Sequence, residues 1–168
     1  MSVVRRMYHT QEKRLLRLAI PIICVRDDAW LGDGYYFWHD CSDAELWGQN
    51  SKRTTGWYEV YQADIDCTDV LDTVFNEERY RFWLEQVEKA AKTILEKTGL
   101  KPTIREINAY FKERGQWGEV AGILFQDIPQ KSTYILVQAF YYRKRIQMAV
   151  YDLQIITNFA FLNENKCS

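Results

Sequence analysis

The order of hydrophobic and polar residues predicts a series of short strands, concentrated toward the two ends of the chain. Residues 57–65 alternate well enough for a half-buried strand, and other stretches carry the apolar, β-branched and aromatic residues that strands favour. Strands are therefore predicted over residues 3–8, 35–38, 57–65, 120–125, 133–140, 146–151 and 155–161. The apolar run 20–25 contains Pro21, which predicts an edge strand or an extended segment.

Helical spacing marks the middle of the chain. Apolar residues recur at helical intervals over residues 77–97, and Gly99 provides the stop. Thr103 and Glu106 form a capping box that opens a second helix toward Gly115, with Ile104, Ile107 and Phe111 as its buried stripe. Two shorter helices are expected over residues 11–18 and after Ser42, where Ser42 and Glu45 have the same S-x-x-E form, and the acidic stretch 66–73 is expected to be a connection.

Helices thus lie mostly in the middle of the chain and strands toward its ends. This segregation predicts an α+β fold with a mixed or antiparallel sheet, in preference to a doubly wound parallel one. A length of 168 residues, without repeats or linkers, predicts a single domain over residues 1–168.

Composition narrows the classes of protein that remain. With 22 basic and 23 acidic residues the net charge is −1, so no global field steers the chain toward nucleic acid or an anionic membrane. No apolar run reaches the length of about 18 residues that a membrane span needs, and residues 1–6 lack the apolar region of a signal peptide. We therefore expect a cytoplasmic protein without membrane contact.

The four cysteines are scattered, and the chain has only two histidines. A zinc site needs closely spaced ligand pairs, and a disulfide framework is typical of shorter secreted chains. Free thiols and no metal site are therefore expected.

One segment gathers features of a ligand site. Gly32 and Gly34 permit a sharp turn close to a ligand, a run of aromatic residues follows, and a predicted helix begins next. Backbone amides, ring faces and a helix N-terminus in one place suit a flat nucleotide. A purely structural role for the same turn and rings remains the alternative.

Three stretches together form a recognisable set. They are Tyr8-His9-Thr10, the G-x-G-x-Y-F turn at 32–37 with Trp47 on the next helix, and Gln147-Met148-Ala149-Val150-Tyr151-Asp152. In this order and register they resemble the diphtheria-toxin-like ADP-ribosyltransferases, particularly the poly(ADP-ribose) polymerase branch with its His-Tyr-Glu triad. The resemblance covers the two ends of the chain and implies an ADP-ribosyltransferase-like β core, in which residues 74–116 are a helical insertion.

The resemblance also implies roles for individual residues. His9 corresponds to the histidine that hydrogen-bonds the adenine-proximal ribose of NAD, and Tyr36 to the tyrosine that stacks on nicotinamide. Trp47 corresponds to the second stacking aromatic, and Gly34 belongs to the turn that approaches NAD. Gln147 occupies the third position of the triad.

Two positions depart from the family pattern. Thr10 replaces a glycine whose backbone clasps the nicotinamide amide, and Gln147 replaces the glutamate needed for chain extension. A carboxamide can hydrogen-bond a ribose but cannot act as a general base. The resemblance therefore implies, at most, mono-ADP-ribosylation of a macromolecule, expected to be a protein, by a toxin-like, defence or regulatory transferase of the glycosyltransferase class.

Structural roles for these residues, and other functions for the chain, are alternatives to a transferase. His9 could be a structural histidine, Trp47 a packing residue, and His39 with Asp40 an acid–base pair or a helix cap. The chain could keep the fold without turnover as a binding protein. The central helices could form a partner or nucleic-acid module, although acidic residues interrupt its basic positions Lys92, Lys97, Lys101, Arg105, Lys112 and Arg114. Removal of an RNA 2′-phosphate would need a basic signature that the sequence lacks.

Overall fold

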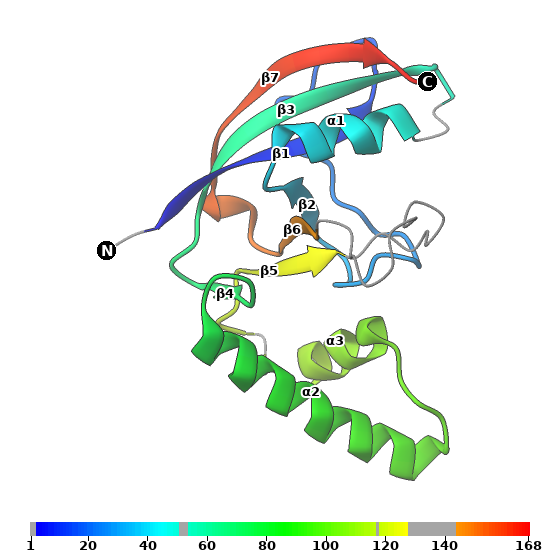
Figure 1. Cartoon of the computed structure of the whole chain (residues 1–168), viewed down its shortest axis with the longest axis vertical. Helices are drawn as coiled ribbons and strands as arrows, with labels where there is room; N and C mark the ends of the chain where they lie inside the picture. The colour runs from blue at the N-terminus through cyan, green and yellow to red at the C-terminus, as the bar shows by residue number, and fades with distance from the viewer. Residues whose placement is uncertain (1–2, 51–53, 117, 128–143) are drawn as a thin grey trace, which may run out of the picture.

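The computed structural model describes residues 3–50, 54–116, 118–127 and 144–168, and these form an α+β fold (Figure 1). Its described strands make one seven-stranded sheet in the order β4-β5-β6-β2-β1-β3-β7, antiparallel throughout except for the parallel pair β4 and β5. The strands are β1 (Val4–Glu12), β2 (Tyr35–Trp38), β3 (Trp57–Asp66), β4 (Val70–Asp72), β5 (Gly122–Asp127), β6 (Arg145–Val150) and β7 (Ile156–Lys166). The prediction of an α+β fold with a mixed or antiparallel sheet is confirmed, and the described sheet is mixed and mostly antiparallel.

Three α-helices accompany the described part of the sheet: α1 (Cys41–Asn50), α2 (Glu77–Thr98) and α3 (Ile104–Glu113). Figure 1 shows α1 lying along β1 and β3, while α2 and α3 lie together at the opposite end of the molecule, beyond β4 and β5. Two consecutive helices in the middle of the chain are therefore confirmed.

The predicted ends of the two central helices are confirmed by their caps. Asn76 accepts a hydrogen bond from the backbone of Arg79 to begin α2, and Gly99 ends it with φ of 72°, a conformation that glycine adopts without strain. Thr103 and Glu106 form both hydrogen bonds of the predicted capping box of α3.

The predicted helix over residues 11–18 is wrong. Strand β1 continues through Gln11 and Glu12 because both residues pair with β3, and the chain then follows an irregular path in which Leu15 and Leu16 are exposed. His9 and Thr10 consequently lie inside the strand and not at its end. Pairing with a neighbouring strand has overridden a weak local helical pattern.

Other boundaries also shift. Helix α1 begins at Cys41, and the carbonyl oxygen of Asp40 accepts its first hydrogen bonds. Ser42 therefore lies inside the first turn, and the prediction that it caps this helix is wrong. The predicted connection 66–73 contains the short strand β4, and β7 runs five residues beyond the predicted end at 161. The strand predicted over residues 133–140 lies outside the described residues.

The pleat of the sheet divides the core between its two faces. Met7, Phe37 and Met148 belong to a cluster on one face, and Tyr8 and Trp38 to a cluster on the other. We call these the Phe37 face and the Trp38 face. Helix α1 packs against the Trp38 face through Ala44, and α2 contributes Trp83 to a third cluster with Ile123, on the same face.

All four cysteines are free thiols. Within the described ranges, no helix combines the length and the hydropathy that a bilayer span requires.

Candidate functional site

The sheet order brings the two ends of the chain together at its centre. Strand β2 lies between β1 and β6, and Trp38 pairs with Tyr8 on one side and with Gln147 on the other. The strands that carry His9, Tyr36 and Gln147 are therefore immediate neighbours, although His9 and Gln147 are separated by most of the sequence.

His9 is buried where β1 and β2 meet. Its Nδ1 donates a hydrogen bond of 2.8 Å to the carbonyl oxygen of Tyr36, and its Nε2 accepts one of 3.3 Å from the backbone N–H of Ile22. Because a carbonyl can only accept and an amide can only donate, the ring is the neutral tautomer with its proton on Nδ1. Burial lowers the pKa of His9 to about 4, which keeps the ring neutral. Both ring nitrogens are thus engaged by backbone groups.

The side chains of His9 and Tyr36 leave the sheet on opposite faces. The His9 ring lies 5.3 Å from the ring of Phe37 on the Phe37 face. Tyr36 instead packs in the cluster of Ile123 and Ala149, on the Trp38 face. The structure therefore brings the backbones of the predicted pair together, but not their side chains.

The phenol of Tyr36 holds the glycine turn. Its hydroxyl donates to the carbonyl oxygen of Gly32 at 2.7 Å and accepts from the N–H of Leu31 at 3.1 Å. Burial raises the pKa of Tyr36 well above its usual range, so the phenol stays protonated as a donor. Tyr36 is only partly buried, and its hydroxyl has a structural task in the turn.

Gly34 joins the turn to the segment before it. Its N–H and carbonyl oxygen exchange hydrogen bonds with Cys24, at 3.1 and 2.8 Å. A Cβ at Gly34 would lie 3.0 Å from the carbonyl oxygen of Val150 and 3.3 Å from the ring of Tyr151. The position therefore needs glycine for close approach to strand β6.

The remaining predicted residues gather on the Trp38 face. Thr10 is buried and donates its hydroxyl to the carbonyl oxygen of Ala44 in α1 at 2.8 Å. Trp47 on α1 is 40% exposed, and its ring lies 5.9 Å from the ring of Trp38. Gln147, partly exposed, pairs with Trp38 across the sheet. Tyr36, Trp47 and Gln147 thus border one face on which planar rings adjoin a carboxamide.

Helix α3 braces the loop that leads into the glycine turn, a role that the sequence did not suggest. Arg105 donates to the carbonyl oxygens of Arg26 and Ala29, at 2.6 and 3.1 Å. Lys112 donates to the carbonyl oxygen of Asp33 at 3.4 Å. The helices predicted to be an insertion therefore hold the segment that carries Gly32 and Gly34.

Tyr151 is a second residue whose task only the structure reveals. Its hydroxyl donates to the carbonyl oxygen of Leu31 at 2.7 Å, and Lys112 lies over its ring. Burial raises the pKa of Tyr151, which keeps the donor protonated. The only sequence signal was its place in the V-Y-D motif.

His39 and Asp40 do not form a close acid–base pair. Their side chains are 3.7 Å apart, and the ring of His39 lies 5.6 Å from that of Phe75. Among the described residues, no three histidine, cysteine or acidic side chains gather as a metal site would require.

Comparison of the chain with protein-family models, curated proteins and solved structures finds no match. The geometry and the sequence motifs therefore carry the functional argument.

Proposed function

We propose that this chain has an ADP-ribosyltransferase-like fold and is an NAD-dependent mono-ADP-ribosyltransferase that modifies a macromolecule. The observation that carries the proposal is the pairing of β1, β2 and β6 at the centre of the sheet. The three motifs lie on these strands or shortly after them, so the sheet gathers segments from both ends of the chain, and this supports the proposal.

The proposed reaction needs little acid–base chemistry. The bond between C1′ of the ribose and the nicotinamide nitrogen breaks, and its electron pair leaves with nicotinamide. A nucleophilic atom of the acceptor forms the new bond to C1′ and releases its proton to solvent. Because the transition state resembles an oxocarbenium ion, positioning of the two reactants supplies most of the acceleration.

The Trp38 face supports this chemistry through its rings. Trp47 and Tyr36 would bind the nicotinamide ring, and Gln147 would hydrogen-bond the nicotinamide ribose. Thr10 would offer its backbone where the family has glycine. His9 lies on the opposite face of the sheet and its Nε2 already accepts a hydrogen bond from Ile22, so it would not contact a ligand bound on the Trp38 face.

The test combines labelled NAD, a cell lysate and the full chain. We expect a labelled acceptor band with the wild type and its loss in Trp47→Ala. Leu46→Ala is the matched control, because Leu46 is the exposed neighbour of Trp47 on α1 and lies outside the proposed site. An equal effect of both substitutions, or no label at millimolar NAD, would count against transfer.

A non-catalytic ADP-ribosyltransferase-like binding protein is the second candidate. It is favoured by the engagement of both His9 nitrogens inside the chain and by a carboxamide at position 147. Gln147→Glu separates the two candidates, because a charge-assisted hydrogen bond is roughly twice as strong as a neutral one. For an enzyme, we expect NAD hydrolysis or automodification to rise about tenfold. An absence of NAD hydrolysis and automodification in both the wild type and the variant would favour the binding protein.

A further inference from the structure

The chain between β1 and β2 carries apolar side chains that the fold leaves uncovered. Residues 13–25 lead from β1 toward the glycine turn along an irregular path. Five of their apolar side chains are at least 46% exposed: Leu15, Leu16, Ile20, Ile23 and Val25. Single exposed apolar residues are common on protein surfaces, whereas neighbouring ones mark an interaction site.

Leu15 and Leu16, which we call the leucine tip, project furthest from this segment. Leu15 is fully exposed and Leu16 is 83% exposed. Hydrogen bonds fix the backbone on both sides of them. The N–H of Lys13 donates to the carbonyl oxygen of Trp57 at 3.0 Å, and the N–H of Leu18 donates to the hydroxyl of Tyr61 at 3.1 Å. The leucine tip is therefore held in place by the sheet, and its burial by a partner would cost little ordering entropy.

Basic residues flank the leucine tip. Residues 13–25 contain Lys13, Arg14 and Arg17 and no acidic residue. Lys13 pairs with Glu164 at 3.1 Å, and the guanidinium of Arg17 lies 3.6 Å from the ring centre of Phe161, a contact that leaves its charge in place. Arg14 and Arg17 are exposed, and neither has an acidic partner among the described residues. The net charge of the whole chain, which predicted no membrane contact, averages out this local positive charge.

Trp57 adds an exposed indole beside Lys13. It is 41% exposed, and Nζ of Lys13 lies 5.3 Å from the centre of its ring. Tryptophan favours the boundary between water and lipid, because its ring combines a large apolar area with one N–H donor.

A protruding apolar tip with cationic flanks fits an anionic membrane surface. A bilayer accepts side chains that project outward, whereas a protein partner would need a cavity matched to them. The leucines would enter between lipid headgroups, and the long stems of Arg14 and Arg17 would let their guanidinium groups bind lipid phosphates. Because the polar groups of an irregular backbone need water, insertion would stay shallow. We propose that the leucine tip docks this protein onto bilayers that contain anionic phospholipids.

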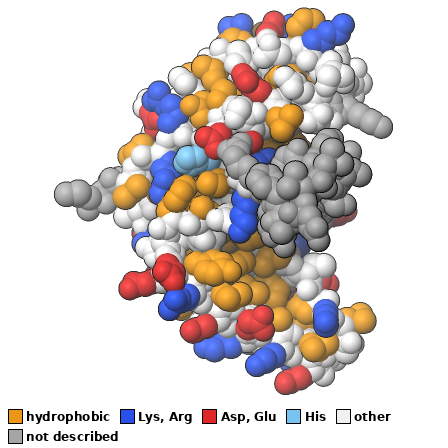
Figure 2. Space-filling view, in the orientation of Figure 1, with side chains coloured by type: hydrophobic (Ala, Val, Ile, Leu, Met, Phe, Trp, Pro, Cys, Tyr) orange, Lys and Arg blue, Asp and Glu red, His pale blue; other side chains and the backbone are white. Residues whose placement is uncertain are grey.

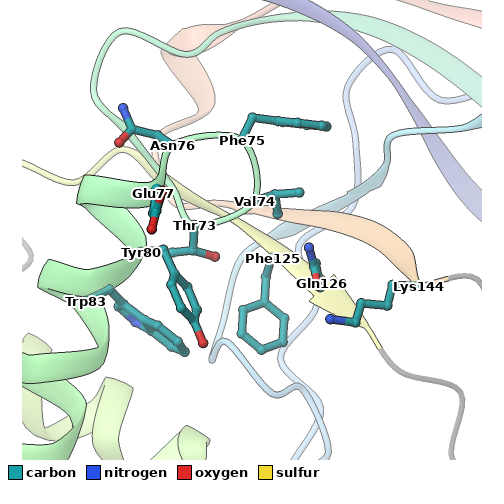
Figure 3. Close-up of a pocket in the computed structure, with 10 residues that line it drawn as sticks. All are labelled: Thr73, Val74, Phe75, Asn76, Glu77, Tyr80, Trp83, Phe125, Gln126 and Lys144. Atoms are coloured by element: carbon teal, nitrogen blue, oxygen red, sulfur yellow. The ribbon is translucent and has the colours of Figure 1, made fainter. Parts of the chain in front are cut away.

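The leucine tip is separate from the proposed NAD site. Residues 13–25 are fastened to the Phe37 face through His9 and Tyr61, whereas the proposed site lies on the Trp38 face. They also contribute no residue to the cavity beside Trp83 at the start of α2, whose volume is about 550 Å³ (Figure 3). Docking through the leucine tip would therefore leave the Trp38 face open.

Co-sedimentation of the full chain with lipid vesicles tests the proposal. We expect binding to vesicles of equal parts phosphatidylserine and phosphatidylcholine. The double variant Leu15→Ser/Leu16→Ser should bind them about a hundredfold more weakly, because burial of each leucine contributes roughly tenfold. Arg14→Gln should weaken binding about fivefold, and vesicles of phosphatidylcholine alone should bind weakly. Leu100→Ser is the matched control, because Leu100 is 72% exposed but lies on the connection between α2 and α3.

Three outcomes would overturn the proposal. Equal binding of the wild type and the double variant would mean that the leucines do not insert, and equal binding to both kinds of vesicle would mean that anionic lipid is not recognised. No binding to either vesicle would exclude membrane docking, and a concentration-dependent dimer that the double variant loses in analytical ultracentrifugation would then identify a second copy as the occupant. Because the substitutions leave the Trp38 face intact, labelling by NAD should be the same in the double variant and the wild type, so failure of docking is distinguishable from failure of the proposed transferase.

Discussion

At the scale of single residues, two buried side chains fasten an irregular segment to the Phe37 face. The Nε2 of His9 accepts from the N–H of Ile22, and the hydroxyl of Tyr61 accepts from the N–H of Leu18. Tyr61 in turn donates to Glu59, a buried carboxylate. The segment therefore keeps its path although Leu15 and Leu16 contribute no buried surface.

The neutral state of His9 predicts a pH-dependent stability. Its pKa is about 4 in the folded chain and about 6.5 when unfolded, so the unfolded state binds one more proton between these values. The free energy of unfolding is therefore greatest above pH 6.5 and falls as pH drops toward 4, by up to about 1.4 kcal/mol per pH unit. Urea unfolding at pH 7, 6 and 5 measures this slope.

A control variant isolates the residue responsible. His9→Gln should lose the slope, and His39→Gln, at the other histidine of the chain, is the matched control. If His9→Gln does not fold, an NMR titration of the wild-type imidazole gives the same answer. A His9 pKa above 6 would contradict the prediction.

At the scale of elements, a close contact fixes α1 against β3. A Cβ at Gly48 would lie 2.2 Å from the ring of Tyr58, which is itself almost fully buried. Glycine inside a helix normally costs about 1 kcal/mol relative to alanine. Here the absence of a side chain permits the contact, so packing outweighs propensity.

Gly48→Ala should therefore destabilise the protein despite its better helix propensity. Overpacking typically costs about 1–3 kcal/mol, so a net loss of roughly 2 kcal/mol is expected in urea unfolding. Ser42→Ala, at an exposed position of the same helix, should change stability by no more than about 0.5 kcal/mol. A stabilised Gly48→Ala variant would show that α1 is not held by this contact.

The capping box of α3 allows a second test at this scale. Thr103→Ala removes the side chain that accepts from the N–H of Glu106, and a loss of about 1 kcal/mol is expected. Thr93→Ala, which removes only a hydroxyl bonded back to Lys89 within α2, should be close to neutral. Equal effects on thermal unfolding would argue against the cap as the source of stability.

At the scale of the whole molecule, the central helices support the candidate site from outside. Figure 2 shows apolar side chains exposed around the junction between the sheet and the α2–α3 end of the molecule. Arg105 donates to the loop that precedes the glycine turn, and Lys112 donates to Asp33 within the turn. Arg114 lies over the ring of Tyr110. Residues proposed as a basic face for nucleic acid are thus partly used within the chain.

Removal of the brace should loosen the turn without unfolding the sheet. Arg105→Ala deletes two hydrogen bonds to loop carbonyls, so faster amide hydrogen exchange is expected at residues 29–34. Lys101→Ala is the control, since Lys101 is exposed on the connection just before α3. Uniform acceleration over all strands would mean global destabilisation and would contradict a local brace.

The sequence by itself determined the elements whose signals are local. The caps at Gly99 and Thr103 depend on residues within one helical turn, and the strand 57–65 depends on simple alternation. The α+β class followed from the order of these elements. Local patterns are reliable where neighbours in sequence are also neighbours in space.

Tertiary structure decided what depends on distant partners. Residues 11 and 12 became strand because β3 pairs with them, and β4 formed because β5 lies beside it. The opposite orientations of His9 and Tyr36 follow from the pleat and register of adjacent strands, which motif spacing does not encode. The brace from Arg105 and the cavity beside Trp83 join segments far apart in the chain, so only folding could bring them together.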